Sequence, residues 1–392
     1  MAAFLETFLC CIKPWLSWGA KIVFLFVFMS LGILVFEWKV LPWLASEDWA
    51  SRMGIVPKLG ERVTVIERKE SVSITQDENI ERMVALYGSV VVGVLEETVP
   101  KAETLALALG QSRSTSGVLV TNDGLLVTYR EREPTPGQNH YTVFLGDGQK
   151  KEAQVAGYDA LTNLLYLRVE GMNTPAIAFT NSADVKPGRR FALLSRTNET
   201  TLSVMPSVVG SYERTWNLAP QTVASSEEWE GVYSLGTSVT NGVPGSPALL
   251  LNGEVAGVLG AVRVDGTTQL FLVPAKALRD SLDRLIAGKL TRPVAGIYYL
   301  TITPLIEQTL GLARDRGALV YSPSERTGLS VLAGSPAALA GLQFGDIIIA
   351  VNGVEINLDL PLSVAIGRLK PGENATLKII RSGVERELSL SL

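Results

Sequence analysis

The sequence predicts a mainly β protein with one N-terminal transmembrane helix and a smaller C-terminal unit of mixed α+β structure. Three observations indicate this fold class. The chain has 392 residues, enough for two or three domains with sizeable cores. An uncharged apolar run lies near its N-terminus. Short β-branched runs separated by turn residues then recur over about 200 residues, as they do in β-barrels and β-sandwiches.

The composition excludes several classes of protein. The chain carries 35 basic and 39 acidic residues and has no long basic run, so no nucleic-acid partner is expected. Its two cysteines, Cys10 and Cys11, leave the rest of the chain without a disulfide framework or a Cys-ligated zinc site. His140 is the single histidine. Because no phosphate-binding or metal-binding loop is found, we predict no cofactor and no metal.

The predicted membrane span is the first element of the chain. Residues Ile22–Phe36 contain no charge, and extension back to Trp15 gives 22 residues, enough to cross about 30 Å of hydrocarbon. Tryptophans bracket the span as interfacial aromatic residues do, at Trp15, Trp18, Trp38 and Trp43. A cleaved signal peptide is the alternative, but the apolar run is long and no clear A-x-A site follows it.

Charges on either side of the span predict its orientation. Lys13 and Lys21 lie on its N-terminal side, whereas Glu37 with Lys39 and then Glu47 with Asp48 follow it. The positive-inside rule then places the N-terminus in the cytoplasm and the chain after about residue 45 outside it. We therefore expect a single-pass protein of the cytoplasmic membrane, with its domains in the periplasm or on the extracellular side.

Four segments follow along the chain. Residues 1–44 are the cytoplasmic N-terminus and the anchor, and the mixed polar residues 45–75 form a stalk. Residues 76–290 begin with a short helix from Asp77 and continue as strands, and residues 291–392 form the second unit. The runs expected as strands of the larger segment are Ser89–Leu95, Gly117–Thr121, Leu125–Thr128, Tyr141–Leu145, Leu164–Val169, Arg190–Leu194, Ser203–Val209, Ala248–Leu251 and Val255–Val262.

The apolar period changes where the larger segment ends. Residues Val273–Lys289 follow a helical period, and Gly288 is the expected helix stop. The last segment mixes strands and short helices. The expected strands are Ala318–Tyr321, Ile347–Val351 and Ala375–Ile380, and the expected helices lie near 336–340 and 361–369.

Four stretches of sequence resemble known motifs. Gly334–Gly353 reads GSPAALAGLQFGDIIIAVNG, which strongly resembles a bacterial PDZ domain. Gly117–Thr128 reads GVLVTNDGLLVT, and Leu161–Glu170 reads LTNLLYLRVE. Gly242–Val258 reads GVPGSPALLLNGEVAGV. These last three resemble the G-V-I-I-x-x-D-G-Y-I-L-T, K-T-D-L-A-L-L-K-I-E and G-N-S-G-G-P-L-L-N motifs of the HtrA (Deg) protease family.

The resemblance implies a trypsin-like double β-barrel domain over 76–290 and a C-terminal PDZ domain over 291–392. It also implies a degenerate catalytic triad: the family's His position falls on Glu131, its Asp position on Asn163 and its Ser position on Pro244. Proline has no hydroxyl, and it lacks the N–H that serves as an oxyanion-hole donor in this fold. The sequence therefore predicts a pseudoprotease and no enzyme activity.

An active atypical HtrA-type serine endopeptidase in envelope protein quality control is the alternative. It would need Ser246 as a displaced nucleophile and His140 or Glu131 as its base, or a Ser–Lys dyad to which no spacing points. The ungapped match from Pro247 onward leaves Ser246 at a glycine position of the motif. A third interpretation is a structural envelope component whose PDZ domain only packs against its own barrel.

The resemblance also implies a peptide-binding site in the PDZ domain. Its carboxylate-binding loop falls on Val294, Ala295, Gly296 and Ile297, whose N–H groups would form an anion nest. The residues expected to wall the pocket for the ligand's last side chain are Val364, Ala365 and Leu369. The expected partners are C-terminal or extended peptides, and family members commonly trimerise, which implies a homo- or hetero-trimer with HtrA-like proteins. The alternative is a PDZ domain that binds nothing.

Overall fold

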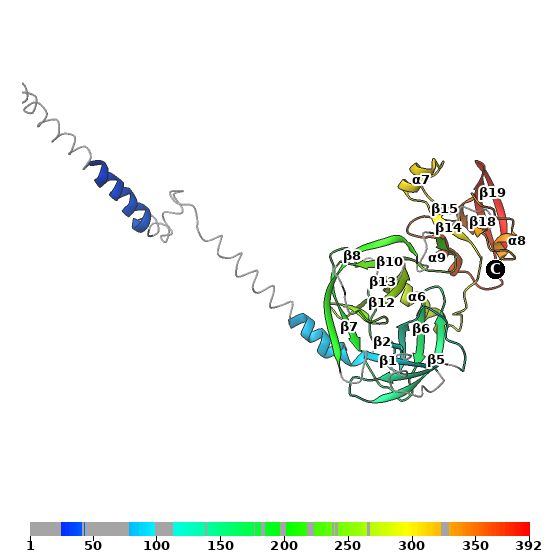
Figure 1. The fold of residues 1–392 in the computed structure, drawn as a ribbon, viewed down its shortest axis with the longest axis horizontal. Helices are drawn as coiled ribbons and strands as arrows, with labels where there is room; N and C mark the ends of the chain where they lie inside the picture. The colour runs from blue at the N-terminus through cyan, green and yellow to red at the C-terminus, as the bar shows by residue number, and fades with distance from the viewer. Residues whose placement is uncertain are drawn as a thin grey trace, which may run out of the picture. The chain divides into compact units, whose positions relative to one another are not determined.

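In the computed structural model the chain forms two units, Met1–Asp77 and Glu78–Leu392. Figure 1 shows the fold, with the chain coloured by residue number. The described residues are 25–40, 43, 78–98, 113–137, 139–175, 177–181, 185–196, 201–217, 223–236, 239, 242–264, 267–322 and 329–392. The predicted stalk at 45–75 lies outside them, as do Cys10 and Cys11.

The described part of the first unit is helical. Residues 25–35 form an α-helix, which the π-helix Phe36–Val40 extends. Its apolar side chains are exposed, and Phe28 and Trp38 reach 71% and 82% exposure. Among the described residues, no helix is both long enough and apolar enough to cross a membrane. Residues 15–24 of the predicted span lie outside the described part.

The second unit begins with a helix over 78–87 and a closed six-stranded barrel. The strands pair in the order β1-β2-β3-β6-β5-β4. They are β1 (Val91–Thr98), β2 (Arg113–Leu119), β3 (Leu125–Tyr129), β4 (Asn139–Phe144), β5 (Lys150–Asp159) and β6 (Leu164–Arg168). Every residue of β3 is buried, because closure of a small barrel fills its interior with side chains while other elements cover this strand from outside.

A second closed barrel follows, in the order β10-β13-β12-β11-β7-β8. Its strands are β7 (Arg190–Arg196), β8 (Leu202–Asn217), β10 (Glu230–Leu235), β11 (Pro247–Leu250), β12 (Val255–Val264) and β13 (Thr267–Pro274). Helix α6 (Ala275–Ile286) leaves β13 directly. It buries Leu278 and Leu282 against the core that the first barrel contributes to, so its apolar stripe joins the two barrels.

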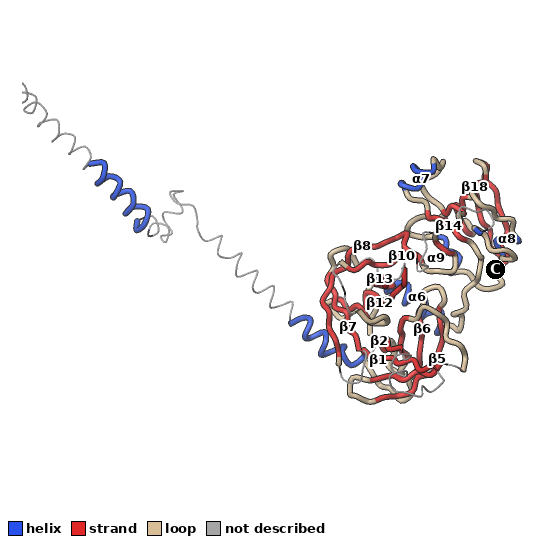
Figure 2. The backbone as a smooth tube through the Cα atoms, viewed as in Figure 1, coloured by secondary structure: helices blue, strands red, loops and turns tan. Residues whose placement is uncertain are grey.

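The chain ends in a seven-stranded sheet of order β19-β18-β16-β15-β14-β9, in which β17 pairs with β16. Strands predominate over helices here as in the barrels (Figure 2). The strands are β9 (Ala224–Ser225), β14 (Tyr298–Thr301), β15 (Ala318–Val320), β16 (Ile347–Val351), β17 (Val354–Glu355), β18 (Asn374–Arg381) and β19 (Val384–Ser391). The helices are α7 (Pro304–Leu310), α8 (Pro336–Leu339) and α9 (Leu362–Gly367).

The prediction of a mainly β chain is confirmed, but several strands escape the sequence patterns. Strand β5 reads KKEAQVAGYD and leaves half of its residues exposed, so it lacks the β-branched run that indicates a buried strand. Strand β19 reads VERELSLS and is exposed at most positions for the same reason. The larger difference is β9, which belongs to the segment 76–290 and yet pairs with the C-terminal sheet.

Candidate functional site

A hollow of about 290 Å³ brings together two of the three positions at which the sequence predicts a degenerate triad. Glu131 lines it from the first barrel, and Pro244 lines it from the second. Its other lining residues are Glu96, Thr115, Tyr129, Arg130, Ala261, Arg263 and Thr268. Among the described residues that line it, none is a serine, cysteine, histidine or lysine. These are the side chains from which nucleophile–base pairs are most often built.

Two charged groups of this hollow, Arg130 and Glu96, form an ion pair. The guanidinium of Arg130 donates to both oxygens of Glu96, at 3.1 Å from Nε and 2.7 Å from Nη2, and Asn139 donates to the same carboxylate. Such a two-point contact is the stronger kind of ion pair. Glu131 lies next to Arg130 and is exposed, so its carboxylate is solvated, as expected for a residue of a surface charge cluster.

Asn163, the third predicted triad position, is not among the residues that line the hollow. It adopts a φ of 57°, in the left-handed region that Asn tolerates better than most residues. Its Oδ1 accepts a hydrogen bond from the Tyr158 hydroxyl at 2.7 Å, and its carbonyl accepts from the Arg130 N–H at 2.9 Å. The Asn163 side chain therefore bonds to a phenol, whereas the triad role requires a bond to an imidazole.

The backbone around Pro244 uses its N–H groups internally. The Pro244 carbonyl accepts from the N–H of Ser116 at 2.9 Å. The N–H of Gly245 donates to Leu259 at 2.7 Å, and that of Ser246 donates to Val243 at 3.2 Å. An oxyanion hole needs N–H groups directed at the reacting oxygen. Here residue 244 has none to offer, and the next two are bonded within the fold.

Of the side chains proposed for an alternative mechanism, Glu131 lines the hollow, whereas Ser246 and His140 do not. Ser246 is 0% exposed, and its hydroxyl contacts the Val243 carbonyl and the Ser195 hydroxyl, each at 2.6 Å. It therefore bonds to oxygen atoms and not to a nitrogen base. His140 is exposed on β4 and lines a different hollow, of about 1060 Å³.

The predicted carboxylate-binding loop has the backbone that its role requires. Ala295 and Ile297 are fully buried, whereas Val294 is half exposed. Gly296 adopts a φ of 77°, and a Cβ there would lie 2.7 Å from Ser335 Oγ. Only glycine fits this position without strain. The turn at Gly296 lets successive N–H groups point to one side, as in an anion nest.

The loop binds a carboxylate group of the same chain. This carboxylate is the side chain of Glu227, which lies in the segment before β10 of the second barrel. The N–H groups of Ala295 and Gly296 both donate to Oε1 of Glu227, at 3.0 and 2.9 Å. The N–H of Ile297 donates to Oγ of Ser226 at 3.0 Å. No sequence pattern identified Ser226 or Glu227, because they lie in the unremarkable run ASSEEWE, nearly 70 residues before the loop.

Residues of helix α9 contribute to two hydrophobic cores, that of the C-terminal sheet and that of the barrels. Ala365 belongs to the core of the C-terminal sheet, and Leu369 packs against that core. Val364, predicted beside them in the pocket wall, belongs to the core cluster of the barrels, and its role in the pocket stays a prediction. A Cβ on Gly367 would lie 2.8 Å from Cδ2 of Leu161. The first barrel therefore contacts the helix whose residues were predicted to wall the peptide pocket.

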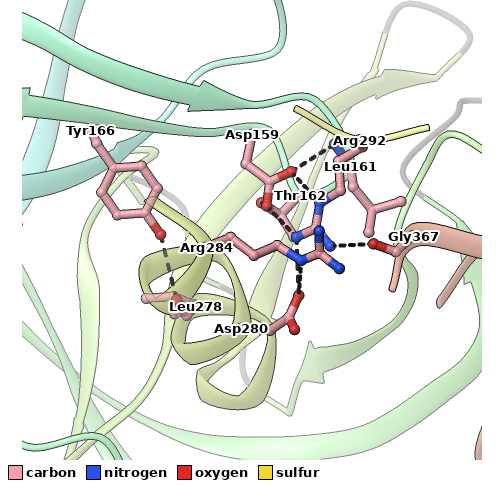
Figure 3. Close-up of polar contacts among 9 residues, drawn as sticks. All are labelled: Asp159, Leu161, Thr162, Tyr166, Leu278, Asp280, Arg284, Arg292 and Gly367. Carbon is pink, nitrogen blue, oxygen red and sulfur yellow. Dashed lines mark hydrogen bonds and ion pairs between the residues drawn. The ribbon is translucent and has the colours of Figure 1, made fainter. Parts of the chain in front are cut away.

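A buried arginine joins the barrels to the C-terminal sheet, as Figure 3 shows. Arg292 binds both oxygens of Asp159 in the first barrel at 3.0 and 2.7 Å, and one oxygen of Asp280 on α6 at 3.0 Å. Its Nη1 donates to the carbonyl of Gly367 at the end of α9, at 2.9 Å. Three elements that are distant in sequence therefore meet at one side chain, the Arg292 clamp.

Glu230 is a buried acidic side chain that connects the second barrel to the C-terminal sheet. Its carboxylate accepts hydrogen bonds from the hydroxyls of Tyr299 at 2.7 Å and Thr301 at 2.6 Å. Burial raises the pKa of Glu230 to about 7, although the two hydrogen bonds lower it in part. Burial, and then the charge of Glu227, raises the pKa of Glu228 to about 8. Both pKa values exceed that of an unfolded glutamate, about 4.3.

We expect the folding stability to fall as the pH rises from about 5 to about 8. In this range the folded chain holds protons on Glu230 and Glu228 that the unfolded chain has released, so deprotonation favours unfolding. Glu230 alone should contribute a loss on the order of 3 kcal/mol. Urea unfolding at several pH values would measure it. Glu230→Gln should flatten the dependence, and an unchanged slope in that variant would contradict the assignment.

In the parts of the chain that the structure describes, no group of three His, Cys, Asp or Glu residues is placed to hold a metal ion. The prediction that the protein needs no metal or cofactor stays a prediction.

Comparisons with known proteins agree with this architecture. Residues 115–258 match the family model of the trypsin-like peptidase domain, and residues 329–381 match that of the PDZ domain. A probable periplasmic DegP-like serine endoprotease of Rhizobium meliloti is 27% identical over 282 residues, and one of Brucella suis is 28% identical over 286. Each match covers 71% of this chain and 52% of the relative, so the chain spans about half the length of these curated relatives.

Solved structures show the same fold. The HtrA-type protease AlgW with a tripeptide has a TM-score of 0.60 at 21% identity, covering 79% of this chain and 95% of its own. The serine endoprotease from Yersinia pestis has a TM-score of 0.52 at 18% identity, covering 79% and 96%. The predicted combination of a mainly β trypsin-like fold with a C-terminal PDZ domain is thereby confirmed.

Proposed function

Because this chain is an HtrA-family protein with a trypsin-like domain followed by a PDZ domain, we propose that it is a membrane-anchored pseudoprotease that binds peptide C-termini. In this role its PDZ domain acts as a scaffold or peptide sensor in the cell envelope. Its degenerate barrels support the PDZ domain and cleave no peptide bond.

One observation carries the peptide-binding part of the proposal. Two successive N–H groups, of Ala295 and Gly296, hold a carboxylate oxygen at 3.0 and 2.9 Å. Capture of a terminal carboxylate in a backbone nest, next to a sheet edge that accepts an added strand, is a common mode of peptide recognition. The loop at 294–297 thus has the chemistry that a free peptide C-terminus requires.

The inactive state of the barrels is supported by the three degenerate positions and their surroundings. Pro244 can neither attack a carbonyl nor donate an N–H, and loss of one oxyanion donor alone typically costs about 10²–10³ in rate. Asn163 bonds to Tyr158, and Ser246 bonds to oxygen atoms in a fully buried position. The described residues that line this hollow therefore include no serine, cysteine, histidine or lysine from which a nucleophile–base pair could be built, which supports the proposed inactivity.

The proposed location rests on the sequence and on the relatives. The apolar run Ile22–Phe36, with lysines before it, supports a single-pass anchor whose N-terminus is cytoplasmic. In the described helix over 25–35 the apolar side chains are exposed, as they are in a helix that faces lipid. DegP-like relatives are named as periplasmic, which supports an envelope location. The family resemblance supports a homo-trimer, or a hetero-trimer with HtrA-like proteins.

The test is a binding experiment on the full chain, purified in detergent, with fluorescent peptides of random sequence. We expect peptides with a free C-terminal carboxylate to bind and the same peptides with a C-terminal amide to bind at least about tenfold more weakly, because the amide loses the charge-assisted hydrogen bonds. Fluorescence anisotropy would measure both. If no free-acid peptide is preferred over its amide, by the natural chain or by one lacking Glu227, the proposed function is wrong.

A fluorophosphonate probe on the same preparation distinguishes the alternative, an active atypical endopeptidase. Such probes label an activated serine, and we expect no labelling of this chain because Ser246 is buried without a base. Labelling that disappears in Ser246→Ala would instead establish the protease. A related active HtrA-type protease serves as the positive control for the probe.

A further inference from the structure

We infer that residues 224–227 form a built-in ligand of the PDZ domain. They occupy the PDZ groove, by which we mean the peptide site formed by the loop at 294–297, strand β14 and helix α9, and an external peptide must displace them before it can bind. This inference rests on the proposed function, since it takes the loop at 294–297 as the site for a peptide carboxylate. It identifies the side chain of Glu227 as the group that competes with a peptide carboxylate for the loop. It also implies a closed state of the groove, in which peptide binding is inhibited.

The built-in ligand occupies the sheet edge that a peptide would need. Strand β14 pairs with β15 on one side and with β9 on the other. The β9 pairing is antiparallel, with Ser225 opposite Tyr298, and the N–H of Ser226 donates to the carbonyl of Ile297 at 3.0 Å. A peptide that binds by strand addition uses the same backbone groups. Because a strand has only two edges, β14 has no vacant one for a second ligand.

The Glu227 side chain occupies the place of a terminal carboxylate. Chain direction brings it there, since an antiparallel strand that passes Tyr299 and then Tyr298 reaches the loop next. Its Oε1 accepts from both Ala295 and Gly296, and each N–H group has a single hydrogen to donate. A peptide carboxylate and the Glu227 carboxylate therefore exclude one another.

The groove is also filled sterically. Ala224, Ser225 and Ser226 are 6%, 7% and 1% exposed, and Ala224 belongs to the core of the C-terminal sheet. On the other side of the groove, Leu161 of the first barrel packs against Gly367 of α9. An incoming peptide with an apolar last residue would need this space, so its binding must move the 224–227 segment and part the barrel from α9.

The segment is held in place at its C-terminal end. The N–H of Trp229 donates to the carbonyl of Leu161 at 2.6 Å, and its indole donates to Gly231 at 2.8 Å. A ligand tethered this closely acts at an effective concentration on the order of millimolar. The apparent affinity of an external peptide is then reduced by the fraction of time that the groove is open, so only a strong or abundant peptide ligand can compete.

The experiment compares the full natural chain with Glu227→Ala in the same peptide-binding assay. We expect Glu227→Ala to tighten the Kd for free-acid peptides at least about tenfold, the factor for loss of one charge-assisted hydrogen bond in the competing strand. Glu152→Ala is the matched control, since Glu152 is an exposed glutamate on β5 and its loss should leave the Kd unchanged. Glu227→Gln tests whether the charge or the hydrogen-bond acceptor matters.

Amide hydrogen exchange of the unliganded chain gives a second readout, independent of any peptide. The N–H groups of Ala295 and Gly296 should exchange slowly in the natural chain and in the Glu152→Ala control, and faster in Glu227→Ala. Equal peptide affinity of the natural chain and Glu227→Ala, or equal exchange at this loop, would overturn the inference while the proposed function stood. Absence of peptide binding in both proteins would overturn the proposed function and, with it, the inference.

Discussion

Replacement of Arg292 by methionine is expected to cost about 3–5 kcal/mol of folding stability, because it leaves a buried charge without its partner. The side chain of Arg292 is 7% exposed, and that of Asp159 is 0% exposed. Asp159 also accepts hydrogen bonds from Leu161 and Thr162 at 3.2 and 3.0 Å, which hold its carboxylate in position. Among the described residues, Arg292 is the cation that forms an ion pair with Asp159, so its loss leaves that carboxylate without its direct partner.

Urea unfolding of the full chain, followed by tryptophan fluorescence, would measure this loss. Arg214→Met is the matched control: Arg214 binds Asp359 at 3.2 Å, but its side chain is 48% exposed, and exposed ion pairs contribute only about 0–1 kcal/mol. The double variant Arg292→Met/Asp159→Asn should recover part of the loss, since the buried charge is then gone as well. Equal losses in the two single variants would show that the Arg292 clamp does not hold the domains together.

Gly245→Ala is expected to destabilise the chain by at least about 3 kcal/mol, at the upper end of single-substitution effects. Gly245 adopts a φ of 87°, which costs a residue with a Cβ about 1–2 kcal/mol. That Cβ would also overlap the Ser116 carbonyl and the Thr128 hydroxyl of the first barrel. The loop that carries Pro244 would have to move away, and the Ser116 hydrogen bond to Pro244 would break.

Gly137→Ala separates the two contributions. Gly137 has a similar φ of 74°, but nothing lies within 4 Å of the position of its Cβ, so its replacement should cost only the conformational term, about 1–2 kcal/mol. Thermal unfolding of both variants and of the natural chain would test this. If the two variants lost the same stability, the close approach of the barrels at Gly245 would make no measurable contribution to the cost of Gly245→Ala.

Local pattern predicted those elements whose residues are buried in a regular way. Ile347–Val351 is a run of buried β-branched and small residues, and its predicted bounds match β16 residue for residue. Helix α6 lies within its predicted range and stops before Gly288, where a left-handed residue ends a helix well. Strand β5, in contrast, mixes lysines, glutamate and glycine, and only its position in a closed barrel makes it a strand.

The positions predicted for a degenerate triad were identified by their place in motifs, whereas their surroundings could not be predicted from the sequence. The sequence alone indicated Glu131, Asn163 and Pro244, and the hollow unites Glu131 with Pro244. The burial of Ser246 and the bond from Tyr158 to Asn163 follow from the packing of two barrels. Such packing depends on contacts between segments that are distant in sequence, and the local periodicity of apolar residues does not predict those contacts.

The sequence by itself determined the strand-rich domain, because this depends on local periodicity and glycine positions, and the resemblance of its motifs pointed to the PDZ domain and to the loop at 294–297. Only the tertiary structure decided what the loop binds. The contacts of Glu227 with Ala295 and Gly296 span 68 and 69 residues, and that of Arg292 with Asp159 spans 133. A carboxylate in a polar turn looks the same in sequence whether it faces water or a nest of N–H groups, since its burial is set by the fold that closes around it.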